Sequence, residues 1–174
     1  MNKRLVLLIP MTLVLVLLVL AGCSNKPYMP SKAETMKPTM KVIVYYPGPE
    51  SLYGEEHEVS KSMNVPKAAL EELLRGKPQA KIEPFFPKKA KVLGVQIEDG
   101  VAIVNLSREI LDLRVDAQSE QLGIAAIVRT LTEFQDIKKV RIVVEGKRRG
   151  KVGGKMIEDW WGNGLIKNQP FEMK

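Results

Sequence analysis

The chain has very little cysteine and very little histidine, and these two scarcities exclude several classes of protein. Its 174 residues include one cysteine, Cys23, and one histidine, His57. A single cysteine cannot form an internal disulfide, and no second Cys or His cluster is present to build a zinc site with it. The folded part must therefore be stabilised by a packed apolar core.

The sequence also lacks a phosphate-binding loop and an evident catalytic set. Residues 146–155, GKRRGKVGGK, do not have the spacing GxxxxGK followed by Ser or Thr. His57 lies in a polar stretch with glutamates at 55, 56 and 58, and no serine or cysteine nucleophile is evidently placed beside it. We interpret His57 as a solvated loop residue.

Two pairs of adjacent acids, Glu71 with Glu72 and Glu158 with Asp159, resemble hydrolase carboxylates only superficially. Adjacent residues on a helix point about 100° apart, so Glu71 and Glu72 cannot share one site closely. We therefore predict that the protein is not an enzyme and binds no cofactor or metal. A wall-modifying enzyme that uses His57 or Glu158 remains the alternative.

One long apolar run is present, at the start of the chain. Residues 1–4 are short and basic, and residues 5–20 are apolar except for Pro10 and Thr12. A membrane-spanning helix needs roughly 20 apolar residues, and this run has 16 with a proline inside. We therefore predict a signal peptide over residues 1–22 rather than a permanent transmembrane helix.

Small residues follow the apolar run and lead directly to the cysteine, in the order Leu20, Ala21, Gly22 and Cys23. This junction, LAGC, resembles the lipobox of bacterial lipoproteins. The resemblance implies a diacylglycerol on the Cys23 thiol, cleavage after Gly22 and a mature chain that starts at residue 23. Ordinary secretion with an incidental cysteine is the alternative.

The covalent lipid on Cys23 would determine where the protein resides. Each buried methylene contributes about 0.8 kcal/mol, and two or more acyl chains hold a protein stably on a membrane. Residues 24–39 have prolines at 27, 30 and 38 and no periodicity, so we expect residues 23–39 to be a lipidated, flexible tether. The predicted location is the extracytoplasmic face of the cell membrane.

The net charge of the chain is positive, +7 overall. Loss of Lys3 and Arg4 with the leader would leave 25 basic and 20 acidic residues, a net +5. Outside the cell the available anions are lipid headgroups and wall polymers, so we expect no nucleic acid partner.

Short apolar and polar segments alternate after the tether. Residues 40–47, MKVIVYYP, predict a strand, and the polar stretch that follows predicts a loop with at most a short extended piece around residues 57–59. A helix is expected over residues 66–75. Its signals are the possible cap Asn64, the first-turn Pro66 and a stripe of Leu70, Leu73 and Leu74 that ends before Gly76.

The clearest local signal is KVLGVQIEDGVAIVNLS, residues 91–107. Asp99 and Gly100 suit a two-residue type I′ turn, so Glu98 should face Val101 and opposed residue numbers should sum to 199. This register places one apolar set on a single face of the hairpin. The set comprises Leu93, Val95 and Ile97 opposite Leu106, Val104 and Ala102.

A second helix and a last strand complete the expected domain. Apolar residues recur at helical spacing over residues 118–134, with Asp116 or Ser119 as a cap. Residues 139–145 then alternate and predict a strand that ends at Gly146. The expected fold is α+β, a single βαββαβ domain whose two helices pack on one face of a small mixed sheet.

Three stretches carry a family resemblance: AALEELLRGKP, VLGVQIEDGVAIVNLS and AAIVRTLTEFQDIKKVRIVVEGK. They resemble the sporulation and spore germination domain known as GerMN, and we assign residues 40–147 to it. The resemblance implies a fold akin to the ring-building motif of secretion-channel proteins, a non-catalytic role and a place in the envelope of spore-forming bacteria. Some relatives carry two copies of the domain, whereas this chain has one.

Residues 148–174 form a basic, Trp-bearing tail that replaces the usual short end of the family. Residues 138–155 hold eight basic residues and one acid, which makes a local positive patch. The patch predicts contact with anionic headgroups, wall polymers or an acidic partner, and a solvated turn is the alternative. The candidate binding residues are Lys147, Arg148, Arg149, Lys151, Lys155, Trp160 and Trp161.

Paired tryptophans suit either an interface or packing. Trp160 and Trp161 can anchor a protein or glycan contact, but a tail that folds back over an open sheet edge would also bury them. We favour packing.

The leading hypothesis is a membrane-anchored lipoprotein whose GerMN-like module binds an envelope protein or self-associates. The alternative is a lipoprotein that binds glycan, wall polymer or a small ligand.

Overall fold

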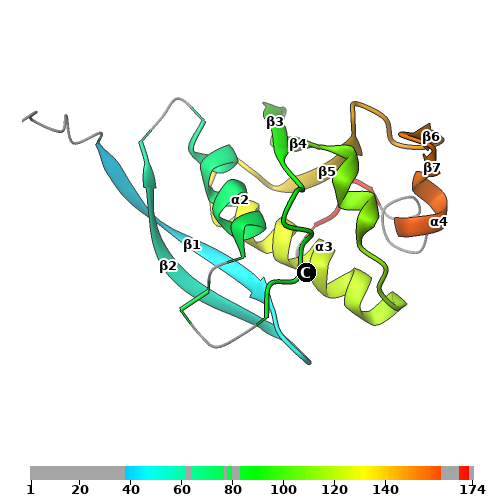
Figure 1. The fold of residues 1–174 in the computed structure, drawn as a ribbon. Coiled ribbons are helices and arrows are strands. Elements are labelled where there is room, and N and C mark those ends of the chain that lie inside the picture. Colours follow the sequence, from blue (N-terminus) through cyan, green and yellow to red (C-terminus); the bar gives the residue numbers. More distant parts are fainter. Residues whose placement is uncertain (1–37, 62–63, 77, 80–82, 162–168, 173–174) are drawn as a thin grey trace, which may run out of the picture. The chain divides into compact units, whose positions relative to one another are not determined.

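Small sheets and two main helices make up the described part of the chain in this computed structural model (Figure 1). The structure describes residues 38–61, 64–76, 78–79, 83–161 and 169–172, so the predicted leader, Leu20, Ala21, Gly22, Cys23 and most of the tether lie outside it. The elements are β1 (Thr39–Pro47), β2 (Leu52–Ser60), α2 (Val65–Arg75), β3 (Val92–Glu98), β4 (Val101–Leu106), η1 (Arg108–Asp112), α3 (Ala117–Thr132), β5 (Lys139–Val144), β6 (Lys151–Val152), β7 (Lys155–Met156) and α4 (Ile157–Trp161).

The expected α+β class is confirmed, and the predicted βαββαβ elements occur in the predicted order. β3, β4 and β5 form a mixed sheet in which β3 and β4 are antiparallel and β4 and β5 are parallel. A parallel pair needs a crossover connection, and α3 supplies it. β1 does not join this sheet but pairs with β2 in a separate hairpin.

β2 corrects the prediction of a loop after β1. It is a nine-residue strand that pairs antiparallel with the whole of β1, from Thr39 opposite Ser60 to Pro47 opposite Leu52. Its LYGEEHEVS sequence has few apolar residues, and Val59 is its only buried position among the described residues. Charged side chains are typical of strands at sheet edges. A prediction that relies on apolar residues therefore misses this strand.

The β3–β4 hairpin confirms the predicted turn and most of the predicted register. Asp99 and Gly100 have φ of 49° and 77°, as a type I′ turn requires, and Glu98 faces Val101. A bulge between Val92 and Gly94 moves Val92 opposite Leu106, so Leu93 turns outward and is 44% exposed rather than buried. Ile97 faces Ala102 as expected but is 45% exposed near the turn.

Both main helices begin and end close to the predicted residues. Asn64 caps α2 by accepting a hydrogen bond from the Lys67 amide at 3.0 Å, and Gly76 ends it with φ of 60°. Asp116 caps α3 by accepting from the Ser119 amide at 2.8 Å.

The two helices pack between the β1–β2 hairpin and the mixed sheet (Figure 1). α2 contacts β1, β2 and β3, and α3 contacts β1 and β5. The core unites apolar side chains from all these layers, among them Val44, Leu70, Leu73, Val104, Ile127 and Leu131. The domain therefore depends on long-range contacts between its two sheets and its helices.

Part of the C-terminal tail folds back onto the open edge of β5. The Phe171 amide donates to the Val140 carbonyl at 2.8 Å, and the Val140 amide donates to the Phe171 carbonyl at 2.9 Å. The Gln169 side chain bonds the amide and the carbonyl of Ile142, each at 3.1 Å. Among the described residues, no helix is both long enough and apolar enough to cross a membrane.

Candidate anion-binding site

The β6–β7 hairpin projects from the end of the domain that bears the predicted basic residues. β6 and β7 join through Gly153 and Gly154, whose φ values of 55° and 88° favour glycine. Val152 and the following Ile157 are buried, at 7% and 1% exposure, and fix the hairpin to the rest of the domain. A carboxylate of Glu158 accepts from the Gly150 amide at 3.0 and 3.1 Å, which closes the loop before β6.

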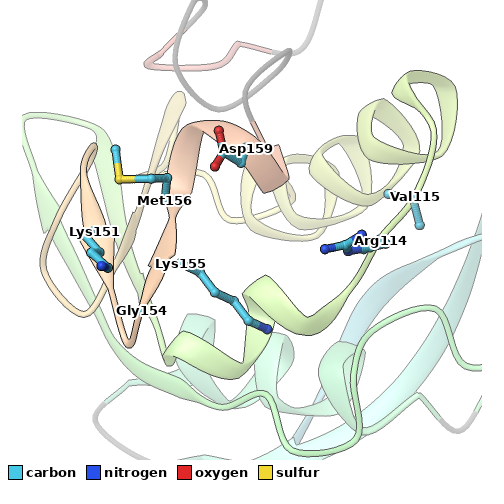
Figure 2. Close-up of a pocket in the computed structure, with 7 residues that line it drawn as sticks. All are labelled: Arg114, Val115, Lys151, Gly154, Lys155, Met156 and Asp159. Atoms are coloured by element: carbon cyan, nitrogen blue, oxygen red, sulfur yellow. The ribbon is translucent and has the colours of Figure 1, made fainter.

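A hollow of about 600 Å³ lies beside this hairpin. Its basic lining comes from three places: Lys151 on β6, Lys155 on β7 and Arg114 after η1. Figure 2 shows Arg114 and Lys155 extending toward one another, with Lys151 on the other strand and Asp159 on α4. Asp159 is the acidic residue of the lining, so cations predominate there.

Two smaller hollows flank the same hairpin, with volumes of about 380 and 270 Å³. Arg108 lines both of them, and its Cδ would lie 2.9 Å from a Cβ added at Gly153. Lys147 and Lys151 add to one hollow beside Glu145. Lys89 and Lys155 add to the other, which Glu109 and Asp112 also line, so cations outnumber acids in each. Cations therefore surround the hairpin on more than one side; we call this set, with Arg148 and Arg149 of the preceding loop, the basic hairpin surface.

Some of these cations are occupied by local partners. Lys155 pairs with Asp112 and also donates to the Leu111 carbonyl at 3.3 Å. Lys147 donates to the Lys151 carbonyl at 3.3 Å, and Arg108 pairs with Glu109 at 3.2 Å.

Three of the predicted binding residues are not paired with a local acid. Arg148, Arg149 and Lys151 are exposed, and their side chains make no ion pair with an acid in the described ranges. An exposed cation that is not held by a local acid remains able to pair with an anion from outside. Lys89 is likewise exposed and in no ion pair within the described ranges, so these four residues are the available charges of the surface.

The structure gathers Lys151 and Lys155 as the sequence suggested and adds cations that the sequence did not point to. Lys89, Arg108 and Arg114 are distant in sequence from the tail and reach the same surface only through the fold. Trp160 and Trp161 belong to α4, but their side chains lie outside the described residues.

His57 is not a solvated loop residue, which corrects the prediction. It lies on β2, its side chain is 11% exposed, and it stands between carboxylates of Glu55 at 3.5 Å and Glu72 at 3.7 Å. Its Nε2 is also 3.2 Å from the Tyr46 hydroxyl. Burial, reinforced by Glu72 and Glu55, raises the pKa of the Tyr46 phenol far above its ordinary value.

This cluster links the β1–β2 hairpin to α2. Glu72 also pairs with Arg75, whereas Glu71 pairs with Lys67 at 3.5 Å, so the two adjacent acids face different partners, as predicted. His57 contacts Glu72 through Nδ1 and Glu55 through Nε2, so the carboxylates lie on different sides of the ring. Within the described ranges, no group of three or more His, Cys, Asp or Glu residues is arranged to hold a metal ion.

These observations define a class of protein. It is a small α+β domain in which two helices pack between the β1–β2 hairpin and a mixed sheet, and the basic β6–β7 hairpin extends it. Residues 43–150 match the family described as Germane, sporulation and spore germination. The chain belongs to this family.

Solved structures support this assignment. The first GerMN domain of the sporulation protein GerM from Bacillus subtilis is 27% identical, with a TM-score of 0.54, and the match covers 70% of this chain and 96% of that one. The tandem GerMN domains of the same protein are 26% identical, with a TM-score of 0.55. That match covers 70% of this chain but only 45% of the tandem structure.

A protein of Clostridium perfringens that is provisionally described as a lipoprotein is also similar. It is 25% identical, with a TM-score of 0.52, over 82% of this chain and 93% of that one. No curated protein sequence matches the chain.

Proposed function

We propose that the protein is a lipoprotein on the extracytoplasmic face of the cell membrane. Its GerMN-type domain serves there as a non-catalytic interaction or assembly module of the cell or spore envelope. The observation that carries this proposal is the LAGC junction at residues 20–23 in the same chain as a sporulation and germination domain.

Three features support the membrane anchor. The apolar run of residues 5–20 is long enough for a signal peptide, and Cys23 follows the small residues Ala21 and Gly22. A similar protein, that of Clostridium perfringens, is provisionally described as a lipoprotein. Two acyl chains on Cys23 would hold the domain stably, where one would bind only marginally.

The placement of the ionisable groups supports a non-catalytic role. His57 bonds between β2, β1 and α2, and Glu158 closes a loop by accepting from Gly150. Both groups therefore have structural partners. The similar GerM structures are described as belonging to a sporulation protein, which supports a role in the same process.

The anchor is tested by replacing Cys23 with serine. We expect the wild-type protein to sediment with membranes and to gain the mass of a diacylglycerol, and Cys23→Ser to be released or to keep its leader. Ser24→Ala, one residue further on, is the matched control and should behave like the wild type. A bare thiol on a wild-type chain that retains its leader would refute the anchor.

The interaction role is tested separately by sedimentation over a range of concentrations, with and without envelope extracts. We expect a shift to larger species through self-association or capture of an envelope protein. Hydrolysis of muropeptides by the purified protein, lost in His57→Ala or Glu158→Gln, would instead establish an enzyme.

Binding of a glycan, wall polymer or small ligand is a second candidate function, favoured by the hollows beside the basic hairpin. Under this alternative, Trp160→Ala should abolish retention on wall fragments. Under the protein-interaction proposal, the same substitution should leave retention unchanged.

A further inference from the structure

We propose that the basic hairpin surface binds the phosphate groups of a phosphodiester-linked envelope polymer, and that Arg148, Arg149 and Lys151 supply the main contacts. This inference rests on the extracytoplasmic location proposed above, because that location determines which polyanions are within reach.

Charge is the first argument. Of the cations at this surface, Arg148, Arg149 and Lys151 are exposed and unpaired within the described part of the chain, whereas Lys155 already pairs with Asp112. Arginine presents a planar fork that suits two phosphate oxygens at once, and lysine adds a compact charge. Adjacent phosphates along a polymer can therefore be held by successive residues of one short loop and strand.

The shape of the surface is the second argument. The cations are arranged around hollows of about 600, 380 and 270 Å³ that flank the hairpin. A flexible chain can follow such an uneven surface and place one phosphate in a hollow beside Arg114 and Lys151, whereas a flat bilayer touches only the most prominent side chains.

The frame that holds these residues is the third argument. Val152 and Ile157 are buried, and Glu158 holds the Gly150 amide, so the loop and hairpin are fixed at both ends. A Cβ added at Gly154 would meet no atom within 4 Å, which leaves the turn open to a close approach by a ligand. Because the backbone of the hairpin is fixed, binding has to order only the side chains.

The position of the hairpin favours a polymer over the anchoring membrane. The start of β1, where the tether would enter, and the β6–β7 hairpin lie at opposite sides of the described domain in Figure 1. A flexible tether at the β1 end does not hold the basic hairpin surface against the bilayer, so this surface is free to meet a polymer.

The test uses the full chain, purified in mild detergent, and a poly(glycerol phosphate) oligomer as the probe. Arg148→Gln, Arg149→Gln and Lys151→Gln are combined in one variant. The matched control removes three charges elsewhere, on β1, at the residue after β2 and on α2, by Lys41→Gln, Lys61→Gln and Lys67→Gln. Binding is measured as a function of salt, beside an uncharged dextran and vesicles with and without phosphatidylglycerol.

We expect the wild type and the control to bind the oligomer with an affinity that falls as salt rises. The hairpin variant should bind roughly a hundredfold more weakly, because three basic residues near the polyanion are lost. Equal loss in the hairpin variant and the control would overturn the site. Binding to anionic vesicles but not to the oligomer would assign the surface to membranes and overturn the polymer proposal.

Membrane retention of the hairpin variant separates this inference from the proposed function. If the variant stays on membranes but binds no less polymer than the wild type, only the inference fails. If the wild type is not lipidated, the proposed location fails whatever the oligomer does.

Discussion

At the scale of the residue, Asn64 joins two elements that are far apart in sequence. Its Oδ1 accepts from the Lys67 amide at 3.0 Å and begins α2, and its Nδ2 donates to the Val95 carbonyl of β3 at 2.8 Å. The sequence indicates the cap, because asparagine before a helical stripe is a common helix start. The second bond depends on β3 lying beside α2 and has no signal in the local sequence.

Asn64→Ala should lower the free energy of unfolding by roughly 2 kcal/mol, about 1 for the lost cap and about 1 for the lost bond to Val95. Asn64→Ser keeps a capping oxygen but is too short to reach Val95, so it should lose about half as much. Denaturant unfolding with an unchanged m-value measures both. Equal losses in the two variants would contradict the separate role of the Val95 bond.

At the scale of the element, α3 has one position where helix propensity and packing oppose each other. Gly123 is buried in the interior of α3, where glycine is normally unfavourable. A Cβ added there would lie 2.6 Å from Cε1 of Phe85, so the glycine makes room for that ring. The sequence alone shows a weak point in a helix, and the fold shows why it is there.

Gly123→Ala should destabilise the protein, because a clash that costs about 1–3 kcal/mol exceeds a propensity gain of about 1 kcal/mol. In a Phe85→Ala background the clash is gone, and the same substitution should become stabilising. Thermal and denaturant unfolding of the wild type, the two single variants and the double variant give the coupling free energy between residues 123 and 85.

Gly94→Ala serves as the control for this cycle, since no atom lies within 4 Å of a Cβ there. It should stabilise the protein by at most about 1 kcal/mol, and equally in both backgrounds. A stabilising Gly123→Ala in the presence of Phe85 would show that the ring moves aside at little cost.

At the scale of the whole molecule, the tail completes the mixed sheet at its β5 edge. Phe171 bonds Val140 through two backbone hydrogen bonds, and Gln169 occupies the Ile142 amide and carbonyl. An uncovered strand edge can pair with another chain. The expected return of the tail to an open sheet edge is thus observed for residues 169–171, while the packing of Trp160 and Trp161 stays a prediction.

A chain that ends after residue 168 should expose the β5 edge, unfold at a lower denaturant concentration and self-associate more as its concentration rises. Sedimentation velocity over a concentration series, with hydrogen exchange at Val140 and Ile142, measures both effects. A chain that ends after residue 172 keeps the bonds to β5 and should behave like the wild type. If both truncated chains stay equally monomeric and equally protected, the tail does not shield the edge.

The sequence determined the features that depend on near neighbours. The α2 cap and stop, the Asp99–Gly100 turn and the α3 stripe were all predictable, because capping, positive φ and helical periodicity involve residues a few positions apart. The sporulation and germination family was recognisable for the same reason, since its landmarks are these local signals in a fixed order.

Only the tertiary structure decided the features that depend on distant partners. β2 reads as a loop because its inward positions are Glu55 and His57. His57 is accommodated by Glu72 and Tyr46 from other elements, and Glu55 accepts from the Gln79 amide. The Leu93 bulge, the separate β1–β2 hairpin and the meeting of Arg114 with Lys151 likewise follow from packing across the domain. Polar groups become compatible with partial burial only when a remote partner satisfies them, and a linear pattern does not contain that partner.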